Sequence, residues 1–92
     1  MVYKIQYTVK AEKDIELLKS SGDKSILLKL RKLLIELSEH PHTGIGQTEK
    51  LKYQKGNTWS RRITKEHRLV YNIYDDTVEV LVLSAYGHYL DK

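Results

Sequence analysis

Four short stretches of the sequence hold the side chains that could do chemistry. They are TEKLK, with Glu49 and Lys52; WSRRI, with Arg61 and Arg62; EHRLVY, with His67 and Arg68; and GHY, with His88 and Tyr89. A carboxylate base, a histidine acid and fixed positive charge are what cleavage of RNA through its own 2′-hydroxyl group requires. The base takes the 2′-hydroxyl proton, an arginine compensates charge on the phosphorane oxygens, and the acid protonates the departing 5′-oxygen. This route needs no metal ion.

Taken one at a time, the same residues have ordinary structural explanations. Glu49 could be a solvated loop carboxylate, as most glutamates are. Arg68 could lay its stem along Leu83 or form half of a structural ion pair, and His88 with Tyr89 could be a tail. Only their combination favours the catalytic interpretation. Histidine suits the acid role because its ordinary pKa lies near neutrality.

Other chemistries are less well supported by the sequence. The four histidines lie at positions 40, 42, 67 and 88, and the first two flank Pro41 without a third ligand at convincing spacing. No glycine-rich phosphate loop follows a strand, and no G-x-S-x-G elbow is present. We therefore predict neither a metal site nor a cofactor.

Length and composition limit the class of protein. The 92 residues predict one domain, residues 1–92, and the absence of cysteine excludes disulfides and thiolate chemistry. Sixteen Lys and Arg against twelve Asp and Glu give a formal charge of +4, which favours an acidic or polyanionic partner. No apolar run is long enough to span a bilayer, so the expected location is the cytoplasm and no membrane partner is expected.

Hydrophobic periodicity predicts the elements that must position these residues. VYKIQYT (2–8) alternates as a strand, and KAEKDIELLKS (10–20) and KSILLKLRKLLIELSEH (24–40) have helical spacing, with Asp23 as the N-cap of the second helix. Pro41 and two glycines end the helical region. Three strands then follow, TWSRRIT (58–64), HRLVYNIY (67–74) and TVEVLVLSA (77–85). The order predicts an α+β domain with a mostly antiparallel sheet.

The expected strand register sets the direction of each charged side chain. A turn at residues 64–66 pairs Arg62 with Arg68 and Trp59 with Tyr71. A second turn at Asp75 and Asp76 places Val78, Val80 and Val82 opposite Ile73, Tyr71 and Leu69. One face is then apolar (Trp59, Ile63, Leu69, Tyr71, Ile73), and the other carries Ser60, Arg62, Arg68 and Asn72.

The last strand raises a question about His88. If the strand continues without interruption, His88 falls on the apolar face with Val82. Glycine often marks a bulge, and one extra residue at Gly87 would turn His88 to the side of Arg68. The residues alone leave both directions of His88 open.

The blocks WSRRITKEHRLVY and SAYGHY, with the spacing between them, resemble the YoeB family of toxins within the RelE superfamily of bacterial toxin–antitoxin systems. The resemblance covers most of the chain and is strongest from GIGQTEKLKY to GHY. It implies a RelE-like, microbial-RNase-like fold. It also implies a ribosome-dependent endoribonuclease that cuts messenger RNA in the decoding site and stops translation. Such toxins often form homodimers and are neutralised by a YefM-like antitoxin.

The resemblance also implies roles for individual residues. By position, Glu49 corresponds to the general base, His88 to the general acid and Arg68 to the phosphate-stabilising residue. Tyr89 assists them in the catalytic set, and Lys52, Arg61 and Arg62 are the expected RNA contacts. His67 corresponds to a structural position, and no metal is implied.

Two points stay open at the level of sequence. The family pattern ends at or just after the His-Tyr pair, whereas LDK follows here, so the role of Tyr89 is less secure than that of His88. The alternative function is a non-catalytic module of the same fold that binds RNA or an antitoxin. Such a binder would need the positive charge but not Glu49, Arg68 and His88 together.

Overall fold

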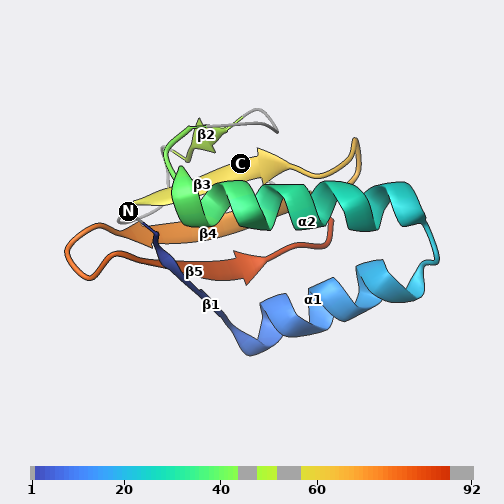
Figure 1. Ribbon diagram of the computed structural model, residues 1–92. Helices are drawn as coiled ribbons and strands as arrows, with labels where there is room; N and C mark the ends of the chain where they lie inside the picture. Colours follow the sequence, from blue (N-terminus) through green and yellow to red (C-terminus); the bar gives the residue numbers. More distant parts are fainter. Residues whose placement is uncertain (1, 44–47, 52–56, 88–92) are drawn as a thin grey trace.

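The computed structural model describes residues 2–43, 48–51 and 57–87. Its elements, in chain order, are β1 (Lys4–Tyr7), α1 (Val9–Ser20), α2 (Lys24–Glu39), β2 (Glu49–Lys50), β3 (Thr58–Arg62), β4 (Arg68–Tyr74) and β5 (Glu79–Ser84). The strands form one sheet in the order β1-β5-β4-β3-β2, in which β1 is parallel to β5 and the other pairs are antiparallel (Figure 1). The predicted α+β fold is confirmed. Neither described helix is long and apolar enough to cross a membrane.

Each helix begins at a residue that satisfies free backbone N–H groups. The Thr8 hydroxyl accepts from the Ala11 N–H at 3.0 Å, and the Asp23 carboxylate accepts from the Ser25 N–H at 3.0 Å. Hydrogen bonds from the Ser25 hydroxyl, and then from the backbone of Ile26 and Ser25, hold the pKa of Asp23 below its usual value. The prediction of Asp23 as N-cap is therefore confirmed.

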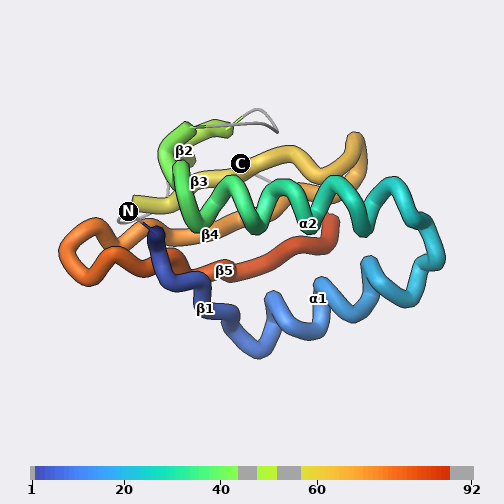
Figure 2. Tube along the Cα trace, in the orientation of Figure 1, coloured from blue at the N-terminus to red at the C-terminus, as the bar shows by residue number. Residues whose placement is uncertain are grey.

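Both helices pack on one face of the sheet, and the trace shows α2 running beside β3 and β4 with α1 nearer β5 (Figure 2). The buried stripe of α2 is Leu30, Leu33 and Leu37, at the spacing of one helix face. These leucines meet the inward side chains of the sheet. The core cluster comprises Ala11, Leu18, Leu30, Leu33, Leu37, Ile63, Leu69, Tyr71, Ile73, Val80, Val82 and Ala85.

The β3–β4 register agrees with the prediction. Arg62 pairs with Arg68 and Trp59 pairs with Tyr71, and the Ile63 N–H donates to the His67 carbonyl at 2.9 Å. Side chains alternate along a strand, so the residues between the core positions point the other way. We call this side of the sheet the outer face, and its members include Glu49, Ser60, Arg62, Arg68 and Asn72.

The predicted β4–β5 register is wrong by two residues. Ile73 pairs with Val80 rather than Val78, and Tyr71 pairs with Val82 rather than Val80. The turn occupies four residues, Asp75 to Val78, and closes through the Val78 N–H to the Asp75 carbonyl at 3.3 Å. Because the shift is even, the valines still face the core.

The extra residue that Gly87 could have introduced occurs earlier in the strand. Pairing jumps from Tyr71–Val82 to Val70–Ser84, so Leu83 is the additional residue. After this bulge, Ala85 rather than Ser84 enters the core, where it is fully buried. Gly87 instead has a left-handed backbone, with φ of 85°. His88 lies outside the described residues.

Arg61 joins the sheet to the end of α2. Its side chain is fully buried on the core side, where Nε donates to the Tyr71 hydroxyl at 3.0 Å. Nη2 donates to the carbonyls of His40 and Thr43, and Nη1 lies 3.8 Å from a carboxylate oxygen of Glu36. The Tyr71 hydroxyl in turn donates to the Pro41 carbonyl at 3.2 Å. One guanidinium therefore holds the loop that follows α2 against β3 and β4.

Replacing Arg61 by Lys should strongly destabilise the fold. A lysine cannot donate to the hydroxyl and both carbonyls at once, so buried acceptors lose their partners. We expect the free energy of unfolding to fall by about 3 kcal/mol or more. Urea denaturation measures the change. Arg62→Lys, one residue away on the outer face, is the matched control and should change stability by less than about 0.5 kcal/mol. Equal losses in the two variants would contradict the structural role of Arg61.

Val78→Gly should stabilise the protein. Val78 has φ of 55°, a region that costs a β-branched residue about 1–2 kcal/mol and costs glycine almost nothing. Allowing for the lost valine side chain and the greater freedom of glycine when unfolded, we expect a gain near 1 kcal/mol, or a rise in Tm of about 4–8 °C. Thr77→Gly, in the same turn without a positive φ, should lower Tm. A lower Tm for Val78→Gly as well would mean that the turn is not strained.

Candidate active site

Glu49 and Arg68 meet on the outer face although they lie on different strands. Glu49 on β2 pairs with Ser60 on β3, and Ser60 pairs with Val70 on β4. Arg68 is on the same side as Val70, two residues earlier along β4. The result is an ion pair of 3.6 Å between Arg68 Nη2 and Glu49 Oε1. The short strand β2, which the sequence did not predict, brings Glu49 into this position.

The ion pair is partly solvated and longer than a hydrogen bond. The Glu49 side chain is 67% exposed and the Arg68 side chain 20% exposed. An exposed pair of this kind contributes little to stability, because water screens it. It can therefore separate at small cost when a ligand approaches. The arrangement offers a carboxylate that can accept a proton beside a cation that can bind a phosphate.

Ser60 lies on β3, between β2 and β4, and on the face where the expected register placed it. It is fully buried, and among the described residues its hydroxyl has no hydrogen-bond partner. Alternation along WSRR places Ser60 and Arg62 on one side and Arg61 on the other, and this is the signal that separates the three. Arg62 on β3 pairs directly with Arg68 on β4, so two arginine side chains lie next to each other on the outer face.

Arg61 does not belong to this surface. The prediction of Arg61 as an RNA contact is corrected here. Its side chain has no exposed area and donates to carbonyls of the His40–Thr43 loop on the core side, so it cannot reach a ligand on the outer face. Lys52, His88 and Tyr89 lie outside the described residues. Of the predicted site residues in the described ranges, Glu49, Arg62 and Arg68 share the outer face.

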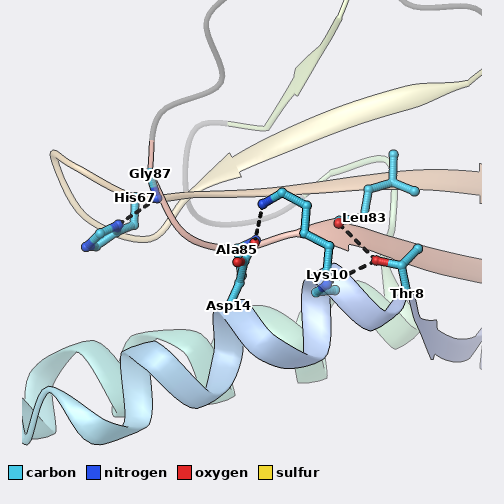
Figure 3. A network of polar contacts seen from close by, with 8 residues as sticks. Thr8, Lys10, Asp14, His67, Leu83, Ala85 and Gly87 are labelled. Atoms are coloured by element: carbon cyan, nitrogen blue, oxygen red, sulfur yellow. Dashed lines mark hydrogen bonds and ion pairs between the residues drawn. The ribbon is translucent and has the colours of Figure 1, made fainter.

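The segment that leads to His88 is anchored to two other elements (Figure 3). From α1 and its N-cap, the Thr8 hydroxyl donates to the Leu83 carbonyl at 3.0 Å, and Asp14 accepts from the Ala85 N–H at 3.1 Å. Asp14 also pairs with Lys10 at 2.8 Å. From the start of β4, the Arg68 N–H donates to the Gly87 carbonyl at 3.0 Å. The backbone as far as Gly87 therefore runs beside Arg68.

Asp14 was also missed by the sequence reading. It is a carboxylate with only 6% of its surface exposed, and its acceptor oxygen satisfies a backbone N–H of the chain's last described segment. Its spacing from Ala11 and Leu18 puts it on the buried face of α1, which is the signal that could have identified it.

His42 of the HPH stretch contacts Asp75 and Trp59. His42 Nε2 lies 3.1 Å from an Asp75 carboxylate oxygen, which also accepts from the Tyr3 hydroxyl at 2.7 Å. The His42 ring meets the Trp59 ring edge-on at 5.5 Å. Within residues 2–43, 48–51 and 57–87, no group of three or more potential metal ligands gathers.

The family model and the known proteins that are similar to this chain all belong to one group of toxins. A family model described as a YoeB-like toxin of bacterial type II toxin-antitoxin system matches residues 7–89. Toxin YoeB of Escherichia coli (strain K12) is 42% identical over 67 residues, which are 73% of this chain and 77% of that protein. The solved structure of a YoeB/ParE toxin from Agrobacterium tumefaciens has a TM-score of 0.84 and 31% identity, covering 94% of this chain and 99% of its own.

The YoeB of Staphylococcus aureus gives two further solved structures. As a dimer it has a TM-score of 0.81, and in a heterotetrameric YoeB-YefM toxin-antitoxin complex 0.76. Both share 32% identity with this chain and cover 97% of it and 100% of their own chains.

Tyr3→Phe should raise the pKa of Asp75. The hydrogen bond from the Tyr3 hydroxyl, followed by that from His42, holds the pKa of this carboxyl below its usual value. The depressed pKa adds stability above the unfolded-state pKa near 3.9, and this stability is lost as the pH falls through the native value. The variant should therefore show a smaller loss of stability on acidification below about pH 4.

Carbon-detected NMR titration of the Asp75 carboxyl measures the shift directly. Tyr7→Phe, at the other end of β1, is the control and should leave the Asp75 titration unchanged. An unaltered Asp75 titration in Tyr3→Phe would show that the hydrogen bond does not form in solution.

Proposed function

The chain belongs to the YoeB-like toxins of bacterial type II toxin–antitoxin systems, and from this membership we propose that it is a ribosome-dependent endoribonuclease that cleaves messenger RNA in the decoding site. The observation that carries the proposal is the 3.6 Å pair of Glu49 and Arg68 on a sheet face that the two described helices leave uncovered. Cleavage of this kind stops translation, and it would take place on ribosomes in the cytoplasm.

The proposed reaction is transesterification through the RNA's own 2′-hydroxyl. Glu49 takes the 2′-hydroxyl proton as the 2′-oxygen bonds to phosphorus, Arg68 stabilises the charge on the non-bridging oxygens, and His88 protonates the departing 5′-oxygen. The products are a 2′,3′-cyclic phosphate and a 5′-hydroxyl end. Tyr89 and Lys52 would orient the reacting groups, and Arg62 would contact the RNA backbone.

Positioning must supply much of the rate in this scheme. The ribosome would hold the message so that the 2′-oxygen, phosphorus and 5′-oxygen approach a line, which converts binding into a favourable geometry for attack. A solvated carboxylate such as Glu49 can act as the general base once the bound RNA excludes water from it. The net charge of +4 would assist the approach to ribosomal and messenger RNA.

The proposed protein partner is a YefM-like antitoxin. The Staphylococcus aureus YoeB forms a heterotetrameric complex with YefM and has also been solved as a dimer. We extend both modes of assembly to this chain. An antitoxin segment that is partly disordered when free would order against the basic outer face and compete with RNA for Arg62 and Arg68.

Mapping of mRNA ends tests the activity. Purified protein is added to ribosomes translating a defined message, and primer extension locates new ends. We expect ends within the codon in the decoding site, each with a 5′-hydroxyl group. Binding to ribosomes without new ends, over several messages, would instead establish the non-catalytic binding module.

The same assay assigns the residues. Glu49→Gln and His88→Ala should each lower the cleavage rate by about 10²–10⁴, and Arg68→Ala by about 10²–10³. The Arg68→Ala and His88→Ala losses should be less than additive if the two residues act as a unit. The midpoint of thermal unfolding should stay close to the original in each variant.

Glu79→Gln is the matched control for Glu49→Gln. Glu79 lies at the far end of the sheet, where it pairs with Tyr74 and accepts from Gln6 at 2.9 Å. The amide can keep a hydrogen bond with Gln6, so neither cleavage nor stability should change. If Glu79→Gln slows cleavage as much as Glu49→Gln, the general-base assignment is wrong.

A further inference from the structure

Gly87 is held at both of its backbone polar groups by two consecutive residues. Its N–H donates to His67 Nδ1 at 2.8 Å (Figure 3). Its carbonyl accepts from the Arg68 N–H at 3.0 Å. Because each peptide unit is planar, fixing the N–H orients the unit between residues 86 and 87. Fixing the carbonyl orients the unit that leads from Gly87 to residue 88.

The backbone of Gly87 has a conformation that these two bonds must maintain. Its φ of 85° lies in the left-handed region, and no atom of residues 2–43, 48–51 or 57–87 lies within 4 Å of an added Cβ. Glycine is therefore suited by its backbone freedom and not by lack of space. A glycine without such contacts samples many backbone conformations, and the two hydrogen bonds restrict Gly87 to this one.

The hydrogen bond from Gly87 defines the state of the His67 ring. Nδ1 accepts a hydrogen bond from the Gly87 N–H, so Nδ1 carries no proton of its own, and the single N–H of a neutral ring is then at Nε2. The loop before β4 holds the residue in place, since the Thr64 hydroxyl accepts from the His67 N–H at 3.1 Å. The His67 ring also lies 4.5 Å from the Tyr86 ring, at 38° between planes.

Arg68 connects this backbone contact with the reacting groups. Its main-chain N–H holds the Gly87 carbonyl while its side chain lies 3.6 Å from Glu49. His67 is its immediate neighbour, so one dipeptide holds both peptide units of Gly87 and presents the cation of the candidate site.

We propose that His67 is a positioning residue, whose neutral Nδ1 fixes the Gly87 backbone and thereby sets the direction in which the chain leaves for the proposed acid at position 88. The catalytic consequence rests on the function proposed above. His67 does not itself contact RNA in this scheme. Its loss should lower kcat and leave KM nearly unchanged, because Glu49, Arg62 and Arg68 still bind the substrate.

Two substitutions separate the hydrogen bond from the ring contact. His67→Asn keeps an acceptor near the place of Nδ1 and loses the ring that meets Tyr86. His67→Phe keeps a ring against Tyr86 and loses the acceptor. A purely structural role for the ring would spare Phe and harm Asn, which is the reverse of what the proposal requires.

Single-turnover cleavage on programmed ribosomes gives the kinetic result. We expect His67→Phe to lower the cleavage rate by up to about 100-fold at saturating ribosomes, and His67→Asn to recover most of it. His42→Phe is the control, because His42 bonds Asp75 at the opposite end of the β4–β5 hairpin. Full activity of His67→Phe, or an Asn variant as slow as Phe, would overturn the proposal.

An NMR measurement tests the hydrogen bond without reference to activity. A scalar coupling between the Gly87 amide ¹⁵N and His67 Nδ1 passes only through an N–H···N hydrogen bond, and we expect it in the unaltered protein. We also expect slow exchange of the Gly87 amide proton, which becomes fast in His67→Phe. Absence of the coupling would overturn the proposal even if the protein cleaves RNA.

The two readouts distinguish the two proposals. A protein that shows the coupling but produces no mRNA ends would refute the proposed nuclease and leave the His67–Gly87 contact established. A protein that cleaves mRNA without the coupling would retain the nuclease and refute the role of His67.

Discussion

The buried guanidinium of Arg61 is the interaction on which the rest of the structure depends. A permanent charge without exposed surface must find acceptors, since its desolvation is costly. Here the acceptors are the Tyr71 hydroxyl on β4 and two carbonyls just beyond α2, with the Glu36 carboxylate nearby. Satisfying Arg61 therefore requires that α2, the loop after it, β3 and β4 assemble together. Because Arg68 also lies on β4, the same contact helps to fix one of the two strands that carry the Glu49–Arg68 pair.

Alternation along the strands predicted most of the fold, and the two errors in the prediction, the β4–β5 register and the position of Arg61, have physical causes. The faces of β4 and β5 were correct although their register was displaced by two residues, because a period of two cannot detect an even shift. The displacement arose at Val78, whose left-handed backbone extends the turn. Valine rarely adopts this conformation, so nothing in the sequence indicated it. Arg61 was predicted as an RNA contact from the family resemblance, although alternation places it with Trp59 and Ile63 on the core side. The two carbonyls that accept from Arg61 lie 21 and 18 residues away in the sequence, so no local pattern could identify them.

The candidate site was predicted as a set of residue types more successfully than as a geometry. Glu49 and Arg68 do meet, but through a two-residue strand too short to give any periodicity. A bulge that changes the phase of the last strand could be anticipated at Gly87, yet it occurs at Leu83, where no glycine is present. The polar residues that hold this segment, Thr8, Asp14 and His67, act on backbone groups. Because every residue type carries these backbone groups, the residues that provide them cannot be recognised from the sequence.

The parallel pairing of β1 with β5 joins segments that are made at different times. Lys4 pairs with Glu79 and Tyr7 with Val82, and the first helix bonds to backbone just beyond them. A ribosome synthesises β1 and α1 long before β5, so these two elements lack their contacts with β5 while most of the domain is being made. The Glu49 and Arg68 strands likewise lack the support of β5 until it leaves the exit tunnel. Vectorial synthesis thus delays completion of this sheet, and a nascent chain still short of β5 is an incomplete toxin.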